Sequence, residues 1–410
     1  LALAGCAGLA LIAPASAQQR RSGWMWTSAA HPYGAANILG NEAAERDLIN
    51  RFGAWNFDRI YTSVGNLPLT APATIARWNA ALHDLGVGSQ MLLGENTWIF
   101  PANRTSLLSL IQTRLVNFNA MRSDPRERFT GLHLDIEPHA LPAWNSGTPA
   151  SRKTMLYQLR DTYADVRALL DDNGAADVDI YADLPVWYDS STTIGWDNAA
   201  ERDQWFFDIG QSLRGISMMA FERSTLGSIV SGVDWEVQNF PGEVRVGLNS
   251  SEIGPGSTFA TYAAFMAMAN NIEAHYGSAI SGVDFQPLYT FAALSPDPIY
   301  NADFNGDGQV DGADLLRWQR GLGIESGATL EQGDANGSGS VNQFDLGVWR
   351  DQFVPAATPA AALVPEPGSA ALALLALVAG GAIAGRLRFG RRSIPALPLP
   401  GGARFRAAWT

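Results

Sequence analysis

The chain has 410 residues, a formal net charge of −12 and a hydrophobic content of 47%, which is enough for a large core and more than one domain. Acidic residues outnumber basic residues by 40 to 28, which argues against a nucleic-acid partner because phosphate contacts require Lys and Arg. Cys6 is the only cysteine, so the protein is expected to fold without disulfide bonds.

An apolar run opens the chain and ends at the small-residue site Ala15-Ser16-Ala17. This pattern predicts a secretory signal peptide over residues 1–17, cleaved after Ala17. Leu3-Ala4-Gly5-Cys6 also resembles a lipobox, which is the alternative. Both interpretations predict export from the cytoplasm.

Residues 22–296 alternate between strand-like and helix-like segments. The strand candidates are 23–28, 57–64, 88–95, 129–137, 178–187, 215–222, 244–249 and 282–291. Amphipathic segments with helical spacing are 44–55, 72–86, 106–122, 155–174 and 259–277. Strands that alternate with helices in this way predict an α/β fold, the (β/α)₈ or TIM barrel. A doubly wound sheet is the competing topology, but no glycine-rich phosphate loop follows the first strand.

The fourth strand candidate ends on an acidic pair. Alternate side chains of a strand share a face, so His133, Asp135 and Glu137 point one way, and the apolar residues between them point the other way. Pro138 marks the end of the strand. Barrel enzymes build their active sites at the C-terminal ends of strands, which makes this pair a candidate site. A salt-bridged acidic pair with no catalytic role is the alternative.

Further carboxylates and aromatic residues fall near other predicted strand ends. The carboxylates are Glu95, Asp183, Glu222 and Glu252, and the aromatic residues are Trp24, Trp26, Trp98, Trp144, Trp187 and Tyr188. An acidic cleft with tryptophan platforms suits a sugar, whose C–H faces stack on indole rings. The predicted catalytic residues are therefore Glu137, Asp135, Glu222, Glu252 and Asp183. The predicted substrate-binding residues are the five tryptophans, Glu95 and His133.

Two segments carry a family resemblance. Residues 130–137, TGLHLDIE, resemble the fourth-strand motif DGxDxDxE of chitinase-like family 18 glycoside hydrolases, and residues 219–222, MAFE, are similar to the sixth-strand M-x-Y-D of that family. The resemblance implies that Glu137 protonates the glycosidic oxygen. It also implies that Asp135 supports a substrate acetamido group acting as the internal nucleophile.

The chain departs from that pattern at three positions, and a second pattern fits the same strand. Thr130 and His133 replace the first two acids, and Phe221 replaces the tyrosine. Glu137-Pro138 also resembles the Glu-Pro ending of the fourth strand in retaining clan-A glycosidases, which implies Glu137 as acid/base and Glu252 as nucleophile. Both resemblances require one protonated and one ionised carboxyl group.

Two acidic loops recur within residues 299–354. The first has oxygen ligands at the spacing of a calcium loop: Asp303, Asn305, Asp307, Gln309 through its backbone carbonyl, Asp311 and Asp314. The corresponding residues of the second are Asp334, Asn336, Ser338, Ser340, Asn342 and Asp345. This duplication resembles a type I dockerin, a small all-α, EF-hand-like module, and implies Ca²⁺ as the ligand and a cohesin domain as the partner. The second loop has fewer charges and is expected to bind calcium more weakly. A pair of acidic turns without metal is the alternative.

The C-terminal region carries a further signal. Residues 364–392 contain Pro365-Glu366-Pro367, a short apolar run and then four arginines. These features resemble the PEP-CTERM sorting tail that exosortase enzymes recognise, and they imply a transmembrane helix that holds the protein in the membrane before processing. The basic extension 393–410 is a departure from that pattern. A plain membrane anchor is the alternative.

These signals together predict an exported, surface-associated glycoside hydrolase-like protein that acts on a polysaccharide. The alternative is a non-catalytic carbohydrate-binding or structural surface protein with a degenerate barrel.

Overall fold

The computed structural model describes residues 20–190, 192–297 and 300–353. The predicted signal peptide, sorting tail and basic extension lie outside these residues. Among the helices in the described ranges, none is both long and apolar enough to cross a bilayer.

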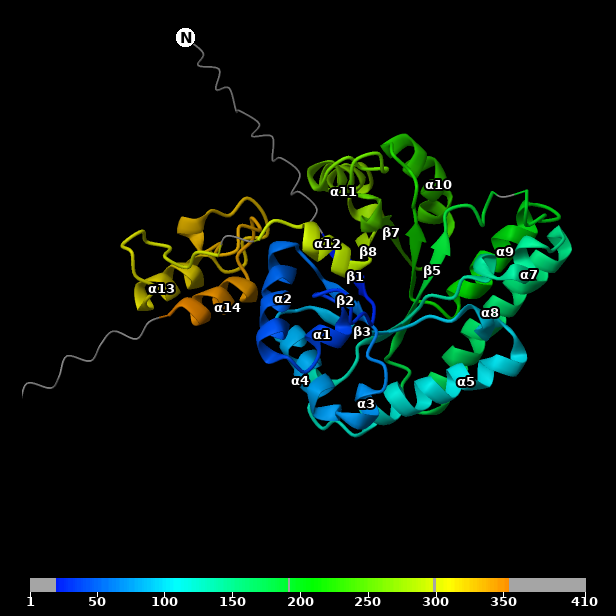
Figure 1. Ribbon diagram of the computed structural model, residues 1–410, viewed down its shortest axis with the longest axis horizontal. Helices are drawn as coiled ribbons and strands as arrows, with labels where there is room; N and C mark the ends of the chain where they lie inside the picture. The colour runs from blue at the N-terminus through cyan, green and yellow to red at the C-terminus, as the bar shows by residue number, and fades with distance from the viewer. Residues whose placement is uncertain (1–19, 191, 298–299, 354–410) are drawn as a thin grey trace, which may run out of the picture. The chain divides into compact units, whose positions relative to one another are not determined.

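Eight parallel strands close into a barrel in the order β1 to β8, and β1 pairs with both β2 and β8 (Figure 1). The strands are β1 (Arg21–Met25), β2 (Arg59–Thr62), β3 (Gly88–Leu93), β4 (Gly131–Leu134), β5 (Asp179–Pro185), β6 (Gly215–Met219), β7 (Glu243–Asn249) and β8 (Gly282–Gln286). The predicted TIM barrel is confirmed, and the closed strand order excludes the doubly wound alternative.

Helices surround the strands in Figure 1. Their bounds are α1 (Ala35–Ile38), α2 (Glu42–Ala54), α3 (Leu67–Thr70), α4 (Pro72–His83), α5 (Pro101–Ile111), α6 (Asn117–Ala120), α7 (Pro142–Asn145), α8 (Pro149–Asp172), α9 (Ala199–Gly210), α10 (Leu226–Asn239), α11 (Tyr262–Tyr276) and α12 (Leu288–Leu294). A π-helical segment, Gln112–Val116, joins α5 to α6 within the predicted helix 106–122.

The predicted eighth strand is too long. It extends to residue 291, whereas β8 ends at Gln286 and α12 begins at Leu288. Leu288 and Phe291 are fully buried and lie three residues apart, a spacing that places both on one side of a helix. Their apolar character indicated burial correctly but did not distinguish helix from strand.

The barrel domain has two apolar regions. The larger fills the space between strands and helices, and the smaller lies within the barrel, where Trp24, Tyr61 and Leu92 pack together. Inward-facing positions of β1, β2 and β3 supply these three residues. The interior of the barrel is thus packed with side chains, so a ligand can enter only at an end.

The C-terminal module has two helices, α13 (Gly312–Gly321) and α14 (Gln343–Gln352), and its own small core around Trp318 and Val341. Each helix begins with a capping box whose two members belong to the preceding acidic loop. The last ligand position of each predicted calcium loop therefore also stabilises the start of a helix.

Candidate active site

Two cavities open where the strands end, and Glu137 lines both of them. Their volumes are about 480 Å³ and about 240 Å³. The larger cavity is lined by Glu137, His139, Pro185, Val186, Trp187, Met219, Phe221, Glu222 and Arg223. The smaller cavity is lined by Trp26, Gly94, Glu95, Asn96, Asp135 and Glu137. If a ligand extends through both cavities, the Glu137 carboxyl group can contact the covalent bond that joins its two parts.

The end of β4 determines where the acidic pair lies. The Asp135 N–H donates to the Leu93 carbonyl at 2.9 Å, which continues the β3–β4 ladder for one residue. The Glu137 N–H then donates to Asn96 Oδ1 at 2.7 Å. Pro138 begins a short 3₁₀ turn, so the chain leaves the barrel directly after Glu137. Both carboxyl groups are thereby placed at the mouth.

The surroundings of Glu137 favour its protonated form. Its side chain is 26% exposed, and burial raises the pKa of Glu137 above its ordinary value. His139 Nε2 lies 3.8 Å from Glu137 Oε2, and burial lowers the pKa of His139 to about 4. The imidazole is therefore neutral near pH 7 and does not offset the charge of Glu137. A carboxyl group with a raised pKa keeps its proton to higher pH, which is the property that a general acid requires.

Asp135 lies above a buried polar layer. Burial, followed by the nearby charge of Asp183, raises the pKa of Asp135 well above its usual range. Its Oδ1 atom is buried and has no hydrogen-bond partner among the described residues. Asp183 Oδ1 lies 2.9 Å from His133 Nε2, and Asp183 Oδ2 accepts a 2.9 Å hydrogen bond from Trp24 Nε1. The predicted residues Asp135, Asp183 and His133 are therefore brought together.

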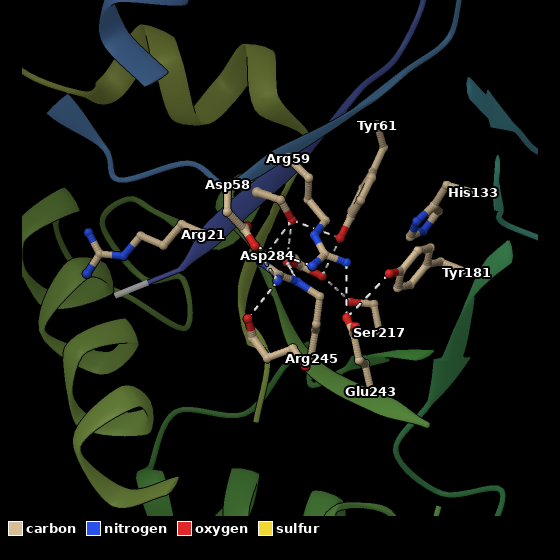
Figure 2. Close-up of polar contacts among 12 residues, drawn as sticks. Arg21, Asp58, Arg59, Tyr61, His133, Tyr181, Ser217, Glu243, Arg245 and Asp284 are labelled. Atoms are coloured by element: carbon tan, nitrogen blue, oxygen red, sulfur yellow. Dashed lines mark hydrogen bonds and ion pairs between the residues drawn. The ribbon is translucent and has the colours of Figure 1, made fainter. Parts of the chain in front are cut away.

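An ion network fills the base of the barrel (Figure 2). Asp284 accepts hydrogen bonds from Arg245 Nε at 2.6 Å, Ser217 Oγ at 2.7 Å and Tyr61 Oη at 3.1 Å. Arg245 also forms an ion pair with Asp58 at 3.2 Å. Burial alone would raise the pKa of Asp284, but the Arg245 guanidinium and the hydroxyl donors lower it below its ordinary value. Asp284 is thus ionised, and both of its carboxylate oxygens accept hydrogen bonds from protein groups.

Glu222 and Glu252 are coupled through the backbone. Glu222 lines the larger cavity and has a φ of 59°, which is unusual for a residue other than glycine. Its N–H lies 3.0 and 2.9 Å from the two carboxylate oxygens of Glu252, which accept from it. Glu252 is not among the residues that line either cavity. Glu252, the predicted nucleophile, thus supports the turn at Glu222, and Glu222 is the one of the two residues that lines the larger cavity.

The predicted tryptophans divide into two groups. Trp26 and Trp187 are partly exposed and line the smaller and the larger cavity respectively. Trp24, Trp98 and Trp144 are 0%, 8% and 3% exposed, so they belong to the core and do not form sugar platforms. Tyr188, also expected on the rim, is fully buried. The prediction of a wide aromatic rim is corrected to two residues.

The remaining lining residues include one predicted contact and three missed ones. Glu95 lines the smaller cavity, and its Oε1 accepts hydrogen bonds from the N–H and the hydroxyl of Thr97. Asn96, His139 and Arg223 also line the cavities but were not predicted. Each lies within two residues of a predicted carboxylate, and this nearness in sequence was the one feature that could have identified them as lining residues.

The first acidic loop is folded around its own carboxylates. Asp303 accepts hydrogen bonds from the N–H groups of residues 306–308. Asp314 accepts from the N–H groups of residues 304 and 305 and from that of Asp311. Gly308 has a φ of 82° at the sharp turn. The donor set consists of carboxylate, amide and carbonyl oxygens, which fits a calcium ion.

The second acidic loop repeats this pattern. Asp334 accepts from the N–H groups of residues 338 and 339, and Asp345 from those of residues 335, 336 and 342. Asp334, Asn336 and Ser340 are nearly buried, at 5–6% exposed, whereas Asp307 of the first loop is exposed. Across the described parts of the chain, no group of three or more His, Cys, Asp and Glu side chains is arranged as a metal site.

Comparison with known proteins identifies the C-terminal module and several proteins with similar barrels. Residues 301–348 match the family model of the type I dockerin domain. No curated protein matches the chain.

A GH18 chitinase from Pseudoalteromonas aurantia is 12% identical with a TM-score of 0.44, over 66% of this chain and 94% of that one. A GH18 chitinase from Cycas revoluta, solved with (GlcNAc)₃, is 10% identical with a TM-score of 0.42, over 67% and 96%. An exo-β-1,4-mannosidase from Opitutaceae bacterium strain TAV5 is 14% identical with a TM-score of 0.43, over 66% and 52%. Since these TM-scores are all below 0.5, the barrel assignment rests on the strand order and register. The chain thus combines an eight-stranded parallel barrel with a segment that matches the type I dockerin domain.

Proposed function

We propose that the barrel is a glycoside hydrolase that acts on a polysaccharide, with Glu137 as the general acid and Asp135 in support. The observation that supports this proposal is the position of Glu137 between two cavities, each lined by one partly exposed tryptophan. Indole rings bind the apolar C–H faces of sugars, so a sugar residue in each cavity would place a glycosidic bond beside Glu137.

In this arrangement, Glu137 donates its proton to the glycosidic oxygen as the bond breaks. Asp135 lines only the smaller cavity, so the sugar that develops positive charge lies there. The carboxyl group of Asp135 stabilises that charge. The family 18 resemblance extends this role to a substrate acetamido group, which makes an N-acetylated sugar the first substrate class to test.

The contacts of Glu252 weigh against the clan-A alternative. A nucleophile must reach the anomeric carbon, whereas both oxygens of Glu252 bind the Glu222 N–H. Glu222 is the other carboxylate of the larger cavity. We therefore propose Glu222, and not Glu252, as the second carboxylate that contacts substrate.

A non-catalytic carbohydrate-binding barrel is the second candidate function. It is favoured by Phe221, which lines the larger cavity without the hydroxyl group that the family motif has at this position. Binding without cleavage is the outcome that separates this candidate from the first.

The first prediction concerns Glu137. Glu137→Gln keeps the size of the side chain but removes the proton that leaves with the glycosidic oxygen. We expect turnover to fall by about 10²- to 10⁴-fold, the usual contribution of a general acid. The measurement is product release from chito-, manno-, cello- and xylo-oligosaccharides. The activity of the wild type should also decline as the pH rises through the raised pKa of Glu137, because only the protonated form is an acid.

Glu127→Gln is the matched control, because Glu127 precedes the same strand at the other end of the barrel. It should leave turnover unchanged. If no oligosaccharide is cleaved by the wild type but several bind to it, the barrel is a binding protein. If Glu137→Gln is as active as the wild type, another carboxyl group is the acid, and Glu222 is then the first to examine.

We further propose that the dockerin segment binds Ca²⁺ through the two loops and docks on a cohesin domain. Both loops have oxygen ligands at the required positions, and the first carboxylate of each, Asp303 or Asp334, accepts hydrogen bonds from N–H groups of its own loop. Export by the N-terminal signal and processing of residues 364–392 by an exosortase-type enzyme complete the proposal. The protein then acts at the cell surface or outside the cell.

A further inference from the structure

Asp135 and Asp183 lie at the same level of the barrel on neighbouring strands. Leu134 of β4 pairs with Ala182 of β5, and the next residue on each strand is one of the two aspartates. Residues paired across parallel strands point to the same side. His133, two residues before Asp135, points into the barrel, where its ring stacks on Tyr61 with centroids 3.8 Å apart. The two carboxyl groups therefore face the same interior space.

The hydrogen bonds of the two carboxyl groups are unequal. Asp183 is 1% exposed, and its two oxygens lie 2.9 Å from His133 Nε2 and Trp24 Nε1. The indole group is always a donor, and a neutral imidazole protonated at Nε2 is a second donor. Asp135 Oδ1 is buried and has no partner among the described residues. Negative charge is therefore better accommodated on Asp183 than on Asp135.

No cation balances a charge on both groups. In the described parts of the chain, neither aspartate forms an ion pair with Lys or Arg, and His133 is the one basic side chain in contact with Asp183. Burial lowers the pKa of His133 to about 3, so its imidazole is neutral at physiological pH. Two buried carboxyl groups on neighbouring strands, with no cation beside them, disfavour ionisation of both, and the charge of Asp183 raises the pKa of Asp135.

The other groups that face the pair increase this repulsion. The ionised Asp284 on β8 lies in the layer below, and Glu137 lies at the mouth. Tyr163 on α8 faces both aspartates, and burial, followed by their charges, raises the pKa of Tyr163. Burial also raises the pKa of Asp183 well above its usual range, although the Trp24 hydrogen bond lowers it in part.

We propose that Asp135 and Asp183 form a coupled acid pair that shares one proton at neutral pH, with Asp183 as the positioning residue that controls the charge of Asp135. In the resting protein, the charge resides on Asp183 and the proton on Asp135. When positive charge develops in the smaller cavity, the favoured site of the proton changes from Asp135 to Asp183, and Asp135 becomes the carboxylate that faces this charge. The catalytic part of this inference rests on the proposed function, but the pairing itself does not.

Carbon-13 NMR of the aspartate side-chain carboxyl groups in the full chain tests the pairing without a substrate. In the wild type at pH 6.5, we expect the Asp135 carboxyl carbon, assigned through Asp135→Asn, at the shift of a protonated acid. Asp183→Asn retains an acceptor for Trp24 but removes the negative charge. The Asp135 titration should then move to lower pH by about one unit or more. Asp179→Asn, at the exposed start of the same strand, is the matched control and should leave the Asp135 signal unchanged.

Trp24→Phe gives a second test if Asp183→Asn does not fold. It removes a donor that stabilises the Asp183 anion, so the proton should move toward Asp183, and Asp135 should again titrate at lower pH. An Asp135 signal that titrates identically in the wild type and in the folded variants overturns the proposal.

The reaction supplies a further measurement. Asp183→Asn should lower kcat, leave KM nearly unchanged and move the acid limb of the pH profile to lower pH. A purely structural role would leave that limb in place. If the NMR shift occurs but the wild type cleaves no oligosaccharide, the pairing is correct and the proposed function fails.

Discussion

Glu236 on α10 is fully buried, and neither of its carboxylate oxygens has a hydrogen-bond partner among the described residues. Burial, followed by the nearby charge of Asp189, raises the pKa of Glu236 from an ordinary value of 4.5 to about 8, although Arg202 lowers it in part. The carboxyl group is therefore protonated in the folded protein at neutral pH. In the unfolded chain it is ionised, so folding takes up a proton.

This difference makes stability depend on pH. A group whose pKa is raised by folding stabilises the fold fully below its unfolded pKa, and the contribution is lost as the pH rises toward the folded pKa. For Glu236 this interval extends from about pH 4.5 to about pH 8.

Glu236→Gln cannot ionise, so it should lose less stability than the wild type between pH 5 and pH 8. We expect a difference of about 3 kcal/mol, or about 6 °C in Tm, from melts at the two pH values. Glu325→Gln, at an exposed position, should follow the wild type. Parallel pH dependences in wild type and Glu236→Gln would show that the carboxyl group finds a partner in solution.

At the scale of elements, the sequence predicts the alternation of strands and helices well but not the depth of a side chain within the barrel. Trp24 and Trp26 lie on the same side of the first strand, yet Trp24 is fully buried and Trp26 lines a cavity. The depth of Trp24 follows from its pairing with Tyr61, which no local pattern reveals. The predicted fourth strand is also too long: it extends to residue 137, whereas β4 ends at Leu134, and Pro138 begins a 3₁₀ turn. The proline therefore marks where the chain turns away from the barrel after Glu137, and not the last residue of the strand.

The loops after the strands are less predictable still. Trp98 and Trp144 were expected on the rim, but short helical turns fold both back into the core. Glu252 was predicted as the nucleophile in the loop after the seventh strand, but its carboxylate accepts the Glu222 N–H. Such contacts join residues far apart in sequence, and a single sequence contains no signal for them.

The turn after β6 gives a prediction at this scale. Left-handed backbone costs an L-residue about 1 kcal/mol or more, and glycine adopts it freely. Glu222→Gly should therefore be more stable than Glu222→Ala by about 1 kcal/mol in denaturant unfolding, since both lack the carboxyl group. Both variants should bind oligosaccharide more weakly than the wild type if Glu222 contacts substrate. Equal stability of the two variants would show that residue 222 has a different backbone conformation in solution.

Glu252→Ala provides the complementary measurement. It removes both acceptors of the Glu222 N–H, so we expect the free energy of unfolding to fall by about 1 kcal/mol. In the Glu222→Gly variant, Glu252→Ala should lower the free energy of unfolding by less than it does in the wild type, because a glycine needs less support to remain left-handed. An unchanged loss in the double variant would mean that the two residues act independently.

At the scale of the whole molecule, both places where function is proposed contain several carboxyl groups. The barrel mouth contains Asp135, Glu137 and Glu222, and the first loop of the C-terminal module has four carboxylates. At the mouth, burial raises the pKa of Asp135 and of Glu137, so protonation reduces the negative charge there. The first loop is largely exposed, and a bound cation would neutralise the charge of its carboxylates. The barrel mouth is therefore expected to respond to pH, and the first loop to calcium.

The calcium prediction follows from the difference between the two loops. The first has carboxylates at four ligand positions and the second at two, Asp334 and Asp345. More carboxylate ligands bind calcium more tightly, so titration of the full chain should show a stronger and a weaker site. Calcium binds the folded loops and not the unfolded chain, so at 100 times its Kd it should stabilise the module by about 2.7 kcal/mol for each site.

Loop variants can assign these sites, provided that helix capping is separated from calcium binding. Asp314 also caps α13, so Asp303→Ala with Asp314→Ala lowers stability even in chelator. The decisive quantity is the difference in Tm between calcium and chelator for each variant. This pair should abolish the tighter site, and Asp334→Ala with Asp345→Ala should abolish only the weaker one. Asp307→Asn retains an acceptor for the Gln309 N–H and should weaken the tighter site without loss of the cap. Glu331→Ala, outside both loops, should retain the full response. If calcium and chelator give identical melting curves for the wild type, the loops are acidic turns that bind no metal.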